Sequence, residues 1–389
     1  MNRNGRAVVG VSLYPWDAVG DPDCAARIRS LGAGQVSLAA AYHTVRALTP
    51  HHPRHKVVTA AHSAVYYRPD PDRWEESGTP LRPAAAAWAE DSFGPAARAL
   101  GDAGLDVLAW VILAHNQRLG TLHPSAAVVN AYGDTYPWAL CVARPEVRRY
   151  CAALAAEAAA QPGLSGLELE SCGWYGFDHL HAHDKTAGLP PAPLARLLLS
   201  LCFCRHCADA YRATGLDARE LRRLVREELD AVLAGTAEDG RLPSDVLAAV
   251  SRMRTDTAGR LRGEVLAAVH AERPGLPVLL HTQPDPLALG ANPGVAPSEL
   301  HDTAAGPVLP FRNRSAEALD AVRAYAGRDR RVVAGVAAVS GLGADLPDLG
   351  SWCADLLAAG ATELRLYHAG LASPQDLAAV RTAVAALAG

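Results

Sequence analysis

The sequence lacks the features that mark membrane proteins, disordered proteins and nucleic-acid-binding proteins. It has no apolar run of 18 residues, the length that a membrane-spanning helix requires. Only 20% of its 389 residues are charged and 50% are apolar, which excludes a disordered chain. It has no basic block, and 41 acidic against 37 basic side chains give a net charge of −4. We therefore expect no nucleic-acid partner and no membrane partner.

The first residues contain a short apolar run but no small-residue cleavage site. This pattern predicts a first β-strand and not a signal peptide. We expect a soluble, cytoplasmic protein, and the sequence leaves open whether it forms a homo-oligomer.

Eight short, nearly continuous apolar runs alternate with alanine- and leucine-rich helical stretches, one of which is Pro83–Ala103. Such runs are typical of parallel strands covered on both faces. Eight strand–helix units predict a (β/α)8 barrel, the TIM-barrel fold of the α/β class. The predicted strands are Ala7–Leu13, Gln35–Ala41, Asp106–Leu113, Gly166–Glu170, Pro277–His281, Pro307–Phe311, Arg331–Val339 and Thr362–Tyr367.

An open, doubly wound sheet is the alternative fold. It is less favoured because no glycine-rich phosphate-binding turn follows the first strand. We expect residues 1–389 to form one barrel domain. The stretch from Cys172 to Arg273 is too long for a single crossover, so we expect a helical insertion at 172–273, after the fourth strand.

Two glutamates of the fourth strand are the leading candidates for catalysis. Side chains alternate along a strand, so Glu168 and Glu170 share one face and the intervening leucines share the other. We expect both glutamates to point into the barrel, with Glu170 nearer the mouth, where active sites of this fold lie. Two buried carboxylates so close should raise one pKa and give a general acid beside a base or nucleophile. A structural ion pair with an arginine or lysine is the alternative reading, above all for Glu168.

The loop after this strand and several other strand ends carry polar and aromatic side chains. Asp178 is a further candidate for catalysis, and His181 and His183 form a weak metal-binding pattern. Together these strand ends indicate a neutral, hydrogen-bonding pocket suited to a sugar. The expected substrate-binding residues are Tyr14, Trp16, Tyr42, His43, His115, Asn116, Trp174, His179, His281, Gln283, Tyr367 and His368.

Three of the eight cysteines lie together as Cys202-Phe-Cys204-Arg-His-Cys207. In a large chain without a secretion signal, the cysteine count favours metal binding or burial over disulfide formation. The spacing places three sulfur atoms around one tight turn, so a fourth ligand must come from elsewhere.

The middle third of the chain resembles (β/α)8 glycoside hydrolases. The segment Tyr136-Pro-Trp-Ala-Leu-Cys141-Val-Ala-Arg-Pro145, the helix after it and the strand Gly166–Glu170 carry this resemblance. The cysteine motif is similar to that of glycoside hydrolase family 42 β-galactosidases, in which three such cysteines and one earlier cysteine hold zinc. The resemblance implies a structural zinc site with Cys141 as the fourth ligand, a place that Cys172 or His206 could take instead, and it implies that Glu170 is the acid/base.

The sequence also departs from that family. Leu169 stands where the family has asparagine, and the seventh strand ends without a carboxylate. We therefore expect a glycoside hydrolase-like enzyme whose second carboxylate is Glu168, Asp178, Asp285 or Asp302. The alternatives are a metal-dependent barrel lyase or isomerase that uses the histidine-rich loop, and a carbohydrate-binding pseudoenzyme.

Overall fold

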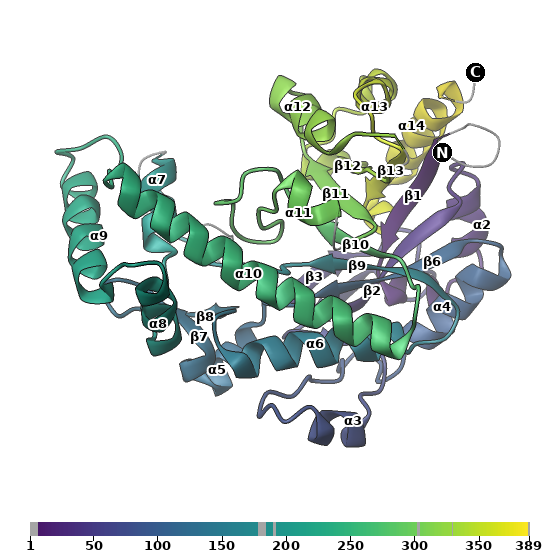
Figure 1. The fold of residues 1–389 in the computed structure, drawn as a ribbon. Helices are drawn as coiled ribbons and strands as arrows, with labels where there is room; N and C mark the ends of the chain where they lie inside the picture. Colours follow the sequence, from purple (N-terminus) through teal and green to yellow (C-terminus); the bar gives the residue numbers. More distant parts are fainter. Residues whose placement is uncertain (1–6, 178–183, 190–191, 302–303, 329, 388–389) are drawn as a thin grey trace.

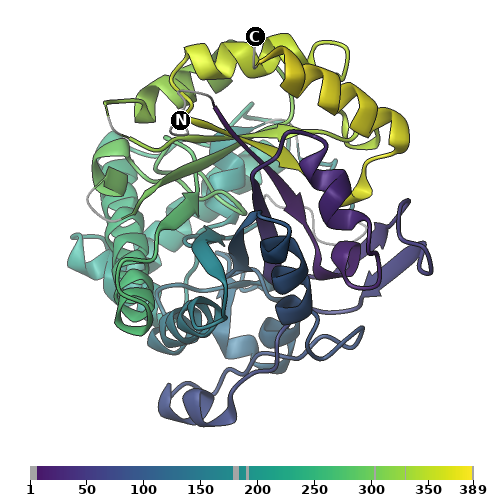
Figure 2. The ribbon, with the colours of Figure 1, turned by 90° about the vertical axis from the view of Figure 1, so that its right-hand side faces the viewer.

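Eight parallel strands close into a barrel in the computed structural model of the protein, which describes residues 7–177, 184–189, 192–301, 304–328 and 330–387. The strands pair in the order β1-β13-β12-β11-β10-β9-β6-β2, and β1 pairs with β2 to complete the ring. Figures 1 and 2 show the barrel and the helices that surround it. The closure confirms the predicted (β/α)8 barrel and excludes the open sheet.

All eight predicted strands are present, with ends that differ by a few residues. Their bounds are β1 Val8–Leu13, β2 Gln35–Tyr42, β6 Asp106–Ile112, β9 Leu164–Glu170, β10 Val278–His281, β11 Gly306–Phe311, β12 Val333–Ala337 and β13 Glu363–Tyr367.

The helices pack their apolar faces on the outside of the strands. The largest of those that cover the barrel are α2 Cys24–Arg29, α4 Phe93–Asp102, α6 Pro145–Ala159, α10 Ser244–Glu272, α12 Ala316–Tyr325, α13 Leu349–Ala358 and α14 Pro374–Ala386. None of the helices in the described ranges is both long and apolar enough to cross a bilayer.

The interior of the barrel is built in layers. Leu108, Leu279, Val308 and Val333 form a small apolar cluster of their own, separate from the main core outside the strands. The charged pair Glu168 and Arg365 joins side chains from β9 and β13 across the interior. A side chain at Gly10 in β1 would collide with the Arg365 guanidinium, so glycine at this position leaves room for the arginine to cross the barrel.

The described part of the long stretch between β9 and β10 contains four helices. Three of them, α7 Pro193–Leu199, α8 Arg205–Ala213 and α9 Ala218–Leu233, gather at one end of α10. The opposite half of α10 lies along α6 outside the barrel (Figure 1). One half of α10 therefore covers the outside of the barrel, and the helices α7, α8 and α9 lie around its other end.

The predicted helix Pro83–Ala103 is wrong in its first half, because α4 begins only at Phe93. The backbone of Val65 donates to Ala84 at 2.8 Å and accepts from Ala86 at 3.0 Å. This segment therefore pairs with the short strand β5 (Ala64–Val65) instead of forming a helix. Helix propensity of alanine is a weak preference, and backbone pairing overrides it here.

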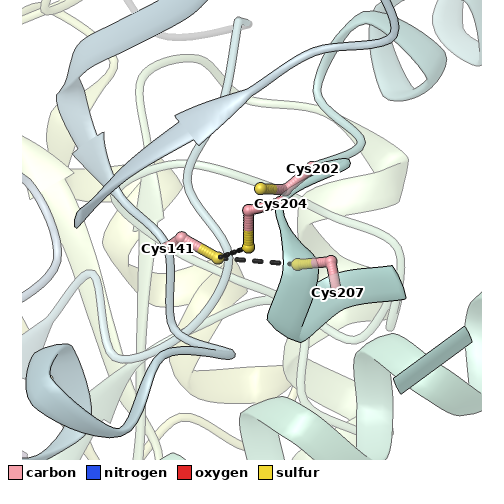
Figure 3. Close-up of side chains that lie close together, drawn as sticks. All are labelled: Cys141, Cys202, Cys204 and Cys207. Carbon is pink, nitrogen blue, oxygen red and sulfur yellow. Dashed lines mark hydrogen bonds between the residues drawn. The ribbon is translucent and has the colours of Figure 1, made fainter. Parts of the chain in front are cut away.

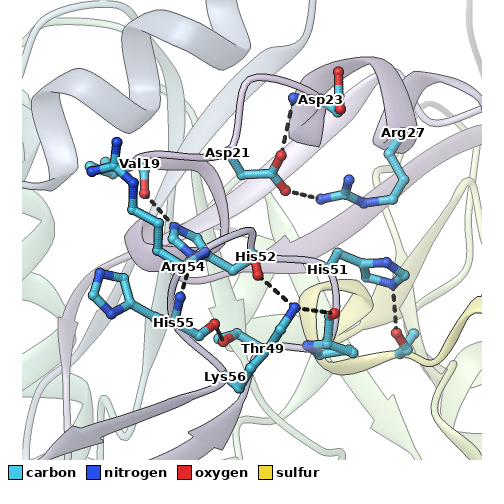
Figure 4. Close-up of polar contacts among 12 residues, drawn as sticks. Val19, Asp21, Asp23, Arg27, Thr49, His51, His52, Arg54, His55 and Lys56 are labelled. Atoms are coloured by element: carbon cyan, nitrogen blue, oxygen red, sulfur yellow. Dashed lines mark hydrogen bonds and ion pairs between the residues drawn. The ribbon is translucent and has the colours of Figure 1, made fainter.

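Two hairpins were not predicted from the sequence. They are β3 Val45–Leu48 with β4 Val57–Ala60, and β7 Ala127–Val129 with β8 Thr135–Leu140. The loop between β3 and β4 is held by histidines (Figure 4). His52 Nε2 bonds the Val19 carbonyl at 3.0 Å, and His51 Nε2 bonds the Ala372 carbonyl at 2.8 Å. These bonds fix the hairpin beside the loops that follow β1 and β13.

Candidate functional site

Glu170 ends β9 at the barrel mouth and lines a cavity of about 700 Å³. This mouth cavity is bounded by residues from seven of the barrel strands and their loops. Its lining is Ser12, Tyr42, His43, Glu170, His281, Leu289, Ala291, Asn292, Val308, Pro310, Phe311, Arg312, Gly335, Ala337, Gly341, Leu342, Arg365 and Tyr367.

Glu170 is a buried acid, and no arginine or lysine of the described residues is bonded to it. The side chain is 8% exposed, and its Oε2 accepts a hydrogen bond from Trp110 Nε1 at 2.8 Å. Burial raises the pKa of Glu170 above its ordinary value of 4.5. His281 and the Trp110 bond act in the opposite direction, and the negative charge of Glu168 adds to the rise. The environment thus favours the protonated form of Glu170.

Glu168 lies two residues deeper on the same face of β9 and has the opposite character. It is 1% exposed, forms an ion pair with Arg365, and accepts a hydrogen bond from Ser37 Oγ at 2.6 Å. Burial alone would raise its pKa, but the Arg365 charge, the nearby His281 ring and the hydrogen bond from Ser37 lower the pKa to about 2. Glu168 is therefore a fixed anion beneath the cavity.

His281 lies beside Glu168 and acts electrostatically on both carboxylates. It ends β10, lines the mouth cavity, and places Nε2 3.5 Å from Glu168 Oε2. Its ring stacks on Trp110 with the ring centres 5.8 Å apart and an angle of 3° between the planes. The Trp110 indole thus contacts both Glu170 and His281.

The expected substrate-binding residues separate into three groups. Tyr42, His43, His281 and Tyr367 line the mouth cavity. Tyr14 and His368 support this wall from behind, with stacked rings whose centres are 5.0 Å apart. Burial lowers the pKa of His368 to about 3, so this ring is neutral near pH 7.

The remaining residues of that set lie elsewhere. Trp16 packs under Tyr14, while His115 and Asn116 line a separate small pocket beside Tyr150. Gln283 lines a neighbouring cavity of about 440 Å³. Trp174 is buried beneath Arg254 of α10. Asp178, His179, His181, His183 and Asp302 fall outside the described residues.

The backbone is strained at two points of the mouth. Ser171 directly after β9 and His368 directly after β13 have φ angles of 56° and 57°, in the left-handed region that non-glycine residues rarely adopt. Ser171 is held there because its N–H donates to Ala291 and its carbonyl accepts from Ala114. Strain of this kind gathers at functional sites. The turn at Ser171 changes the direction of the backbone immediately after Glu170.

Sequence reasoning missed Trp110, Ser37 and Arg365. Arg365 carried a usable signal, because it is a lone cation between two leucines of a buried strand and needs a counter-ion there. Trp110 and Ser37 carried no such signal, since both belong to ordinary inward-facing strand positions.

The second candidate site is the four-cysteine cluster of Cys141, Cys202, Cys204 and Cys207, all of them buried (Figure 3). Cys141 follows β8, and the motif from the α7–α8 loop into α8 supplies the other three. The four sulfur atoms lie within 4.8 Å of one another, and Cys141 Sγ is 3.5 Å from Cys207 Sγ. The fourth member is thus Cys141, and not Cys172 or His206.

These sulfur atoms fit a tetrahedral metal ion. A zinc ion with four sulfur ligands at roughly 2.3 Å holds those ligands about 3.8 Å apart. Cys141 Sγ and Cys204 Sγ stand 3.8 Å apart. Within the described ranges, this is the one group of three or more histidine, cysteine or acidic side chains spaced to hold a metal ion. It uses all four of its sulfur atoms, so a bound ion would have no open position.

No protein-family model and no curated protein matches the sequence, but solved structures share its fold. The glycoside hydrolase domain of PgaB (BpsB) from Bordetella bronchiseptica superposes with a TM-score of 0.59 at 15% identity, over 97% of this chain and 98% of that one. α-L-Fucosidase isoenzyme 2 from Paenibacillus thiaminolyticus gives 0.57 at 13% identity, over 98% of this chain and 49% of that one.

A β-galactosidase from the psychrophilic Marinomonas ef1 also gives 0.57, at 12% identity, over 97% of this chain and 59% of that one. The chain thus spans about half of the fucosidase and about three fifths of the galactosidase. These likenesses establish that the chain shares its (β/α)8 fold with these proteins.

Proposed function

We propose that this protein is a glycoside hydrolase-like enzyme that cleaves or processes a sugar or glycoconjugate, with Glu170 as its general acid. One observation carries the proposal: a buried glutamate with a raised pKa lines a large cavity at the mouth of the barrel. A carboxylic acid with a raised pKa holds its proton to higher pH than an ordinary glutamate, and it can then protonate a leaving-group oxygen. The fold shared with glycoside hydrolases supports the same conclusion.

The walls of the mouth cavity suit a carbohydrate. Tyr42, Tyr367 and Phe311 supply aromatic rings, while Ser12, His43 and Asn292 supply hydrogen-bonding groups. Sugar rings present apolar faces that stack on aromatic side chains and hydroxyls that need hydrogen bonds. The volume of about 700 Å³ lies in the range of small-molecule sites.

In the proposed reaction, Glu170 donates its proton to the glycosidic oxygen as the bond to the sugar breaks. A second group must then activate water or attack the sugar. Glu168 is ionised, but its ion pair with Arg365 and its bond from Ser37 engage both of its oxygens. We therefore assign Glu168 to holding Arg365 and His281 in place, and propose Asp178 as the partner. A separation of about 5 Å between the two carboxyls would give retention, and about 6.5–9.5 Å inversion.

The proposal also includes a structural zinc ion in the four-cysteine cluster. Zinc bound by four thiolates has no position for substrate, so its contribution would be to stability. It would link Cys141 of the barrel to the helical insertion. In this reading residues 1–389 form one barrel domain, and residues 172–273 form an insertion within it.

A carbohydrate-binding protein without turnover is the second candidate function. The observation in its favour is that Glu170 is the one carboxylate that the described residues contribute to the lining of the mouth cavity. The two candidates differ in whether a bound sugar is released unchanged.

The test is Glu170→Gln, assayed on a panel of aryl glycosides together with sugar binding by calorimetry. We expect kcat to fall by about 10²–10⁴-fold with binding retained, because the variant loses the proton but keeps the shape of the side chain. Substrates with good leaving groups should suffer less, since they need little protonation. Glu363→Gln is the matched control, because Glu363 is a buried β13 carboxylate that pairs with Arg331 and does not line the mouth cavity.

Unchanged turnover in Glu170→Gln on a confirmed substrate would contradict the assignment of the acid. Sugar binding by the unmodified protein with no turnover would favour the second candidate. Zinc is tested separately, by metal analysis of the purified protein and of Cys202→Ser, which should lose the ion and stability together.

A further inference from the structure

A second cavity, of about 440 Å³, lies beside the mouth cavity. It is bounded by the loops that follow β10 and β11 and by α12. Along β11, Val308 lines the mouth cavity and its neighbour Leu309 lines the second cavity. Because successive side chains point to opposite faces of a strand, the second cavity lies on the outer side of the barrel wall, next to the helix layer.

The two cavities adjoin at the rim of the barrel. Four residues line both of them: Asn292, Pro310, Phe311 and Arg312. Phe311 ends β11, and the edge of its ring contact with Trp352 places the two ring centres 6.3 Å apart. This contact holds the Phe311 ring at the boundary between the cavities. A ligand in the mouth cavity that reaches this rim has the second cavity directly beyond it.

The loop 283–295, which follows β10, forms a wall common to both cavities. Thr282 Oγ1 donates to the Pro293 carbonyl at 2.7 Å, which closes the base of the loop. The backbone N–H of Ser171 donates to the Ala291 carbonyl at 2.8 Å, so the loop is also tied to the turn directly after β9. The protein's own bonds thus fix this wall, and a preformed site loses less entropy when a ligand binds.

Amide groups and an aromatic ring line the second cavity. Phe311 supplies the ring, and Gln283, Asn292 and Asn313 supply the amides. The Gln283 amide donates to the Asn292 carbonyl at 3.2 Å, which orients it. Amides, like hydroxyls, both donate and accept hydrogen bonds, and the apolar face of a sugar packs on an aromatic ring. The lining therefore fits a sugar unit.

The charges around the second cavity favour an uncharged unit. Asp285 and Glu317 bring two carboxylates to the lining, against the single guanidinium of Arg312. A phosphate, sulfate or uronate would meet more negative than positive charge there. A cationic unit that enters from the mouth cavity would pass Arg312 at the shared rim. The carboxylates can instead accept hydrogen bonds from sugar hydroxyls.

We propose that the second cavity is a second sugar-binding site, which takes an uncharged sugar unit linked to the unit beside Glu170. The inference rests on the proposed function. It narrows the substrate class from a sugar or glycoconjugate to a chain of at least two sugar units, either a free oligosaccharide or the glycan of a glycoconjugate.

The experiment measures sugar binding by calorimetry in the full-length Glu170→Gln protein, which limits cleavage during the titration. The probes are glucose, galactose and N-acetylglucosamine, each compared with disaccharides built from it. We expect a disaccharide of at least one series to bind about 10-fold more tightly than its monosaccharide, since one neutral hydrogen bond is worth about 2- to 12-fold in affinity. Disaccharides that bind no more tightly than their monosaccharides would overturn the inference.

Ala321→Phe, added to Glu170→Gln, tests whether the gain comes from the second cavity. Ala321 lines that cavity from α12 and does not line the mouth cavity. A phenyl ring fills part of the space, so this variant should lose the gain from the second unit. Ala324→Phe is the matched control and should keep the gain, because Ala324 is an exposed residue of the same helix that lines neither cavity. An equal gain in all three proteins would place the second unit elsewhere and overturn the inference.

Asn313→Ala keeps the test valid if Ala321→Phe does not fold. Asn313 is exposed and lines the second cavity but not the mouth cavity. Its truncation should weaken disaccharide binding about 2- to 12-fold and leave monosaccharide binding unchanged. An equal loss for both ligands, or no loss for either, would contradict the inference. If no sugar binds to any of these proteins or to the unmodified protein, the proposed function fails with it, whereas monosaccharide binding without a gain from the second unit refutes only this inference.

Discussion

Glu168 and Glu170 stand two residues apart on the same face of one strand, and both are buried, yet their environments push them toward opposite protonation states. Glu168 meets the Arg365 guanidinium, and its pKa falls to about 2. Glu170 accepts a hydrogen bond from an indole N–H and pairs with no arginine or lysine of the described residues, and its pKa rises. The comparison teaches that burial alone does not decide the state of a carboxyl group, because the presence of a counter-charge reverses its effect.

The largest expected effect on stability comes from removing the anion of this pair. Glu168→Gln leaves Arg365 buried without its counter-ion, and breaking such a pair typically costs about 3–5 kcal/mol. The folded pKa of Glu168 lies below its ordinary value of 4.5. Its contribution to stability is therefore full above about pH 5 and is lost as the pH falls toward 2. Urea unfolding of both proteins at pH 7 and pH 3 measures the loss.

The exposed ion pair of Glu220 with Arg223 provides the control for this prediction. Glu220→Gln should change the free energy of unfolding very little, since water screens both groups. A small effect of Glu168→Gln at pH 7, similar to that of Glu220→Gln, would contradict the role given to the buried pair.

Asp17 extends the comparison to a third buried carboxyl. It accepts a hydrogen bond from the Tyr14 backbone at 2.8 Å, its Oδ1 has no partner among the described residues, and burial raises its pKa from 3.8 to about 7. The folded state therefore binds more protons than the unfolded state between about pH 4 and pH 7, and stability falls as the pH rises through that window. The shift corresponds to at most about 4 kcal/mol.

Asp17→Asn should remove this pH-dependent loss, because the amide cannot ionise. We expect the variant to be more stable than the unmodified protein at pH 8 and close to it at pH 4, as measured by thermal unfolding at both values. A difference between the two proteins that does not change with pH would contradict the raised pKa.

Trp110→Phe has the smallest expected effect. It changes the surroundings of Glu170 and leaves both glutamates in place. It deletes the N–H that favours the ionised form of Glu170, so the pKa of Glu170 should rise further. Activity that needs protonated Glu170 would then persist to higher pH. The pH profile of kcat/KM on an aryl glycoside tests this, and a shift to lower pH would be contrary evidence.

The fold was largely predictable from the sequence because apolar runs mark buried parallel strands. The segment 83–92 was not, since alanine favours helices locally while pairing with Val65 depends on the rest of the fold. The hairpins β3–β4 and β7–β8 were missed as well. The strands β3 and β4 are short and mix buried with exposed residues, and β7 is only three residues long, so none of them forms a long apolar run.

The candidate site was predictable in part. Strand alternation placed Glu168 and Glu170 together, and the cysteine spacing indicated a cluster. The sequence does not show which strands face each other across the barrel. The Ser37–Glu168 and Trp110–Glu170 bonds join residues 131 and 60 positions apart, so they follow only from the closed ring of strands.

The central claim is that Glu170 holds its proton where Glu168 does not, and difference infrared spectroscopy measures this directly. Spectra of the unmodified protein are recorded across a pH titration, and those of Glu170→Gln and Glu168→Gln are subtracted in turn, so that each difference isolates one carboxyl group. We predict that the Glu170 carboxyl titrates with a midpoint above 4.5 and the Glu168 carboxyl with a midpoint near 2. A Glu170 midpoint at or below 4.5, or a protonated carboxyl band that disappears in Glu168→Gln at neutral pH, would contradict the account.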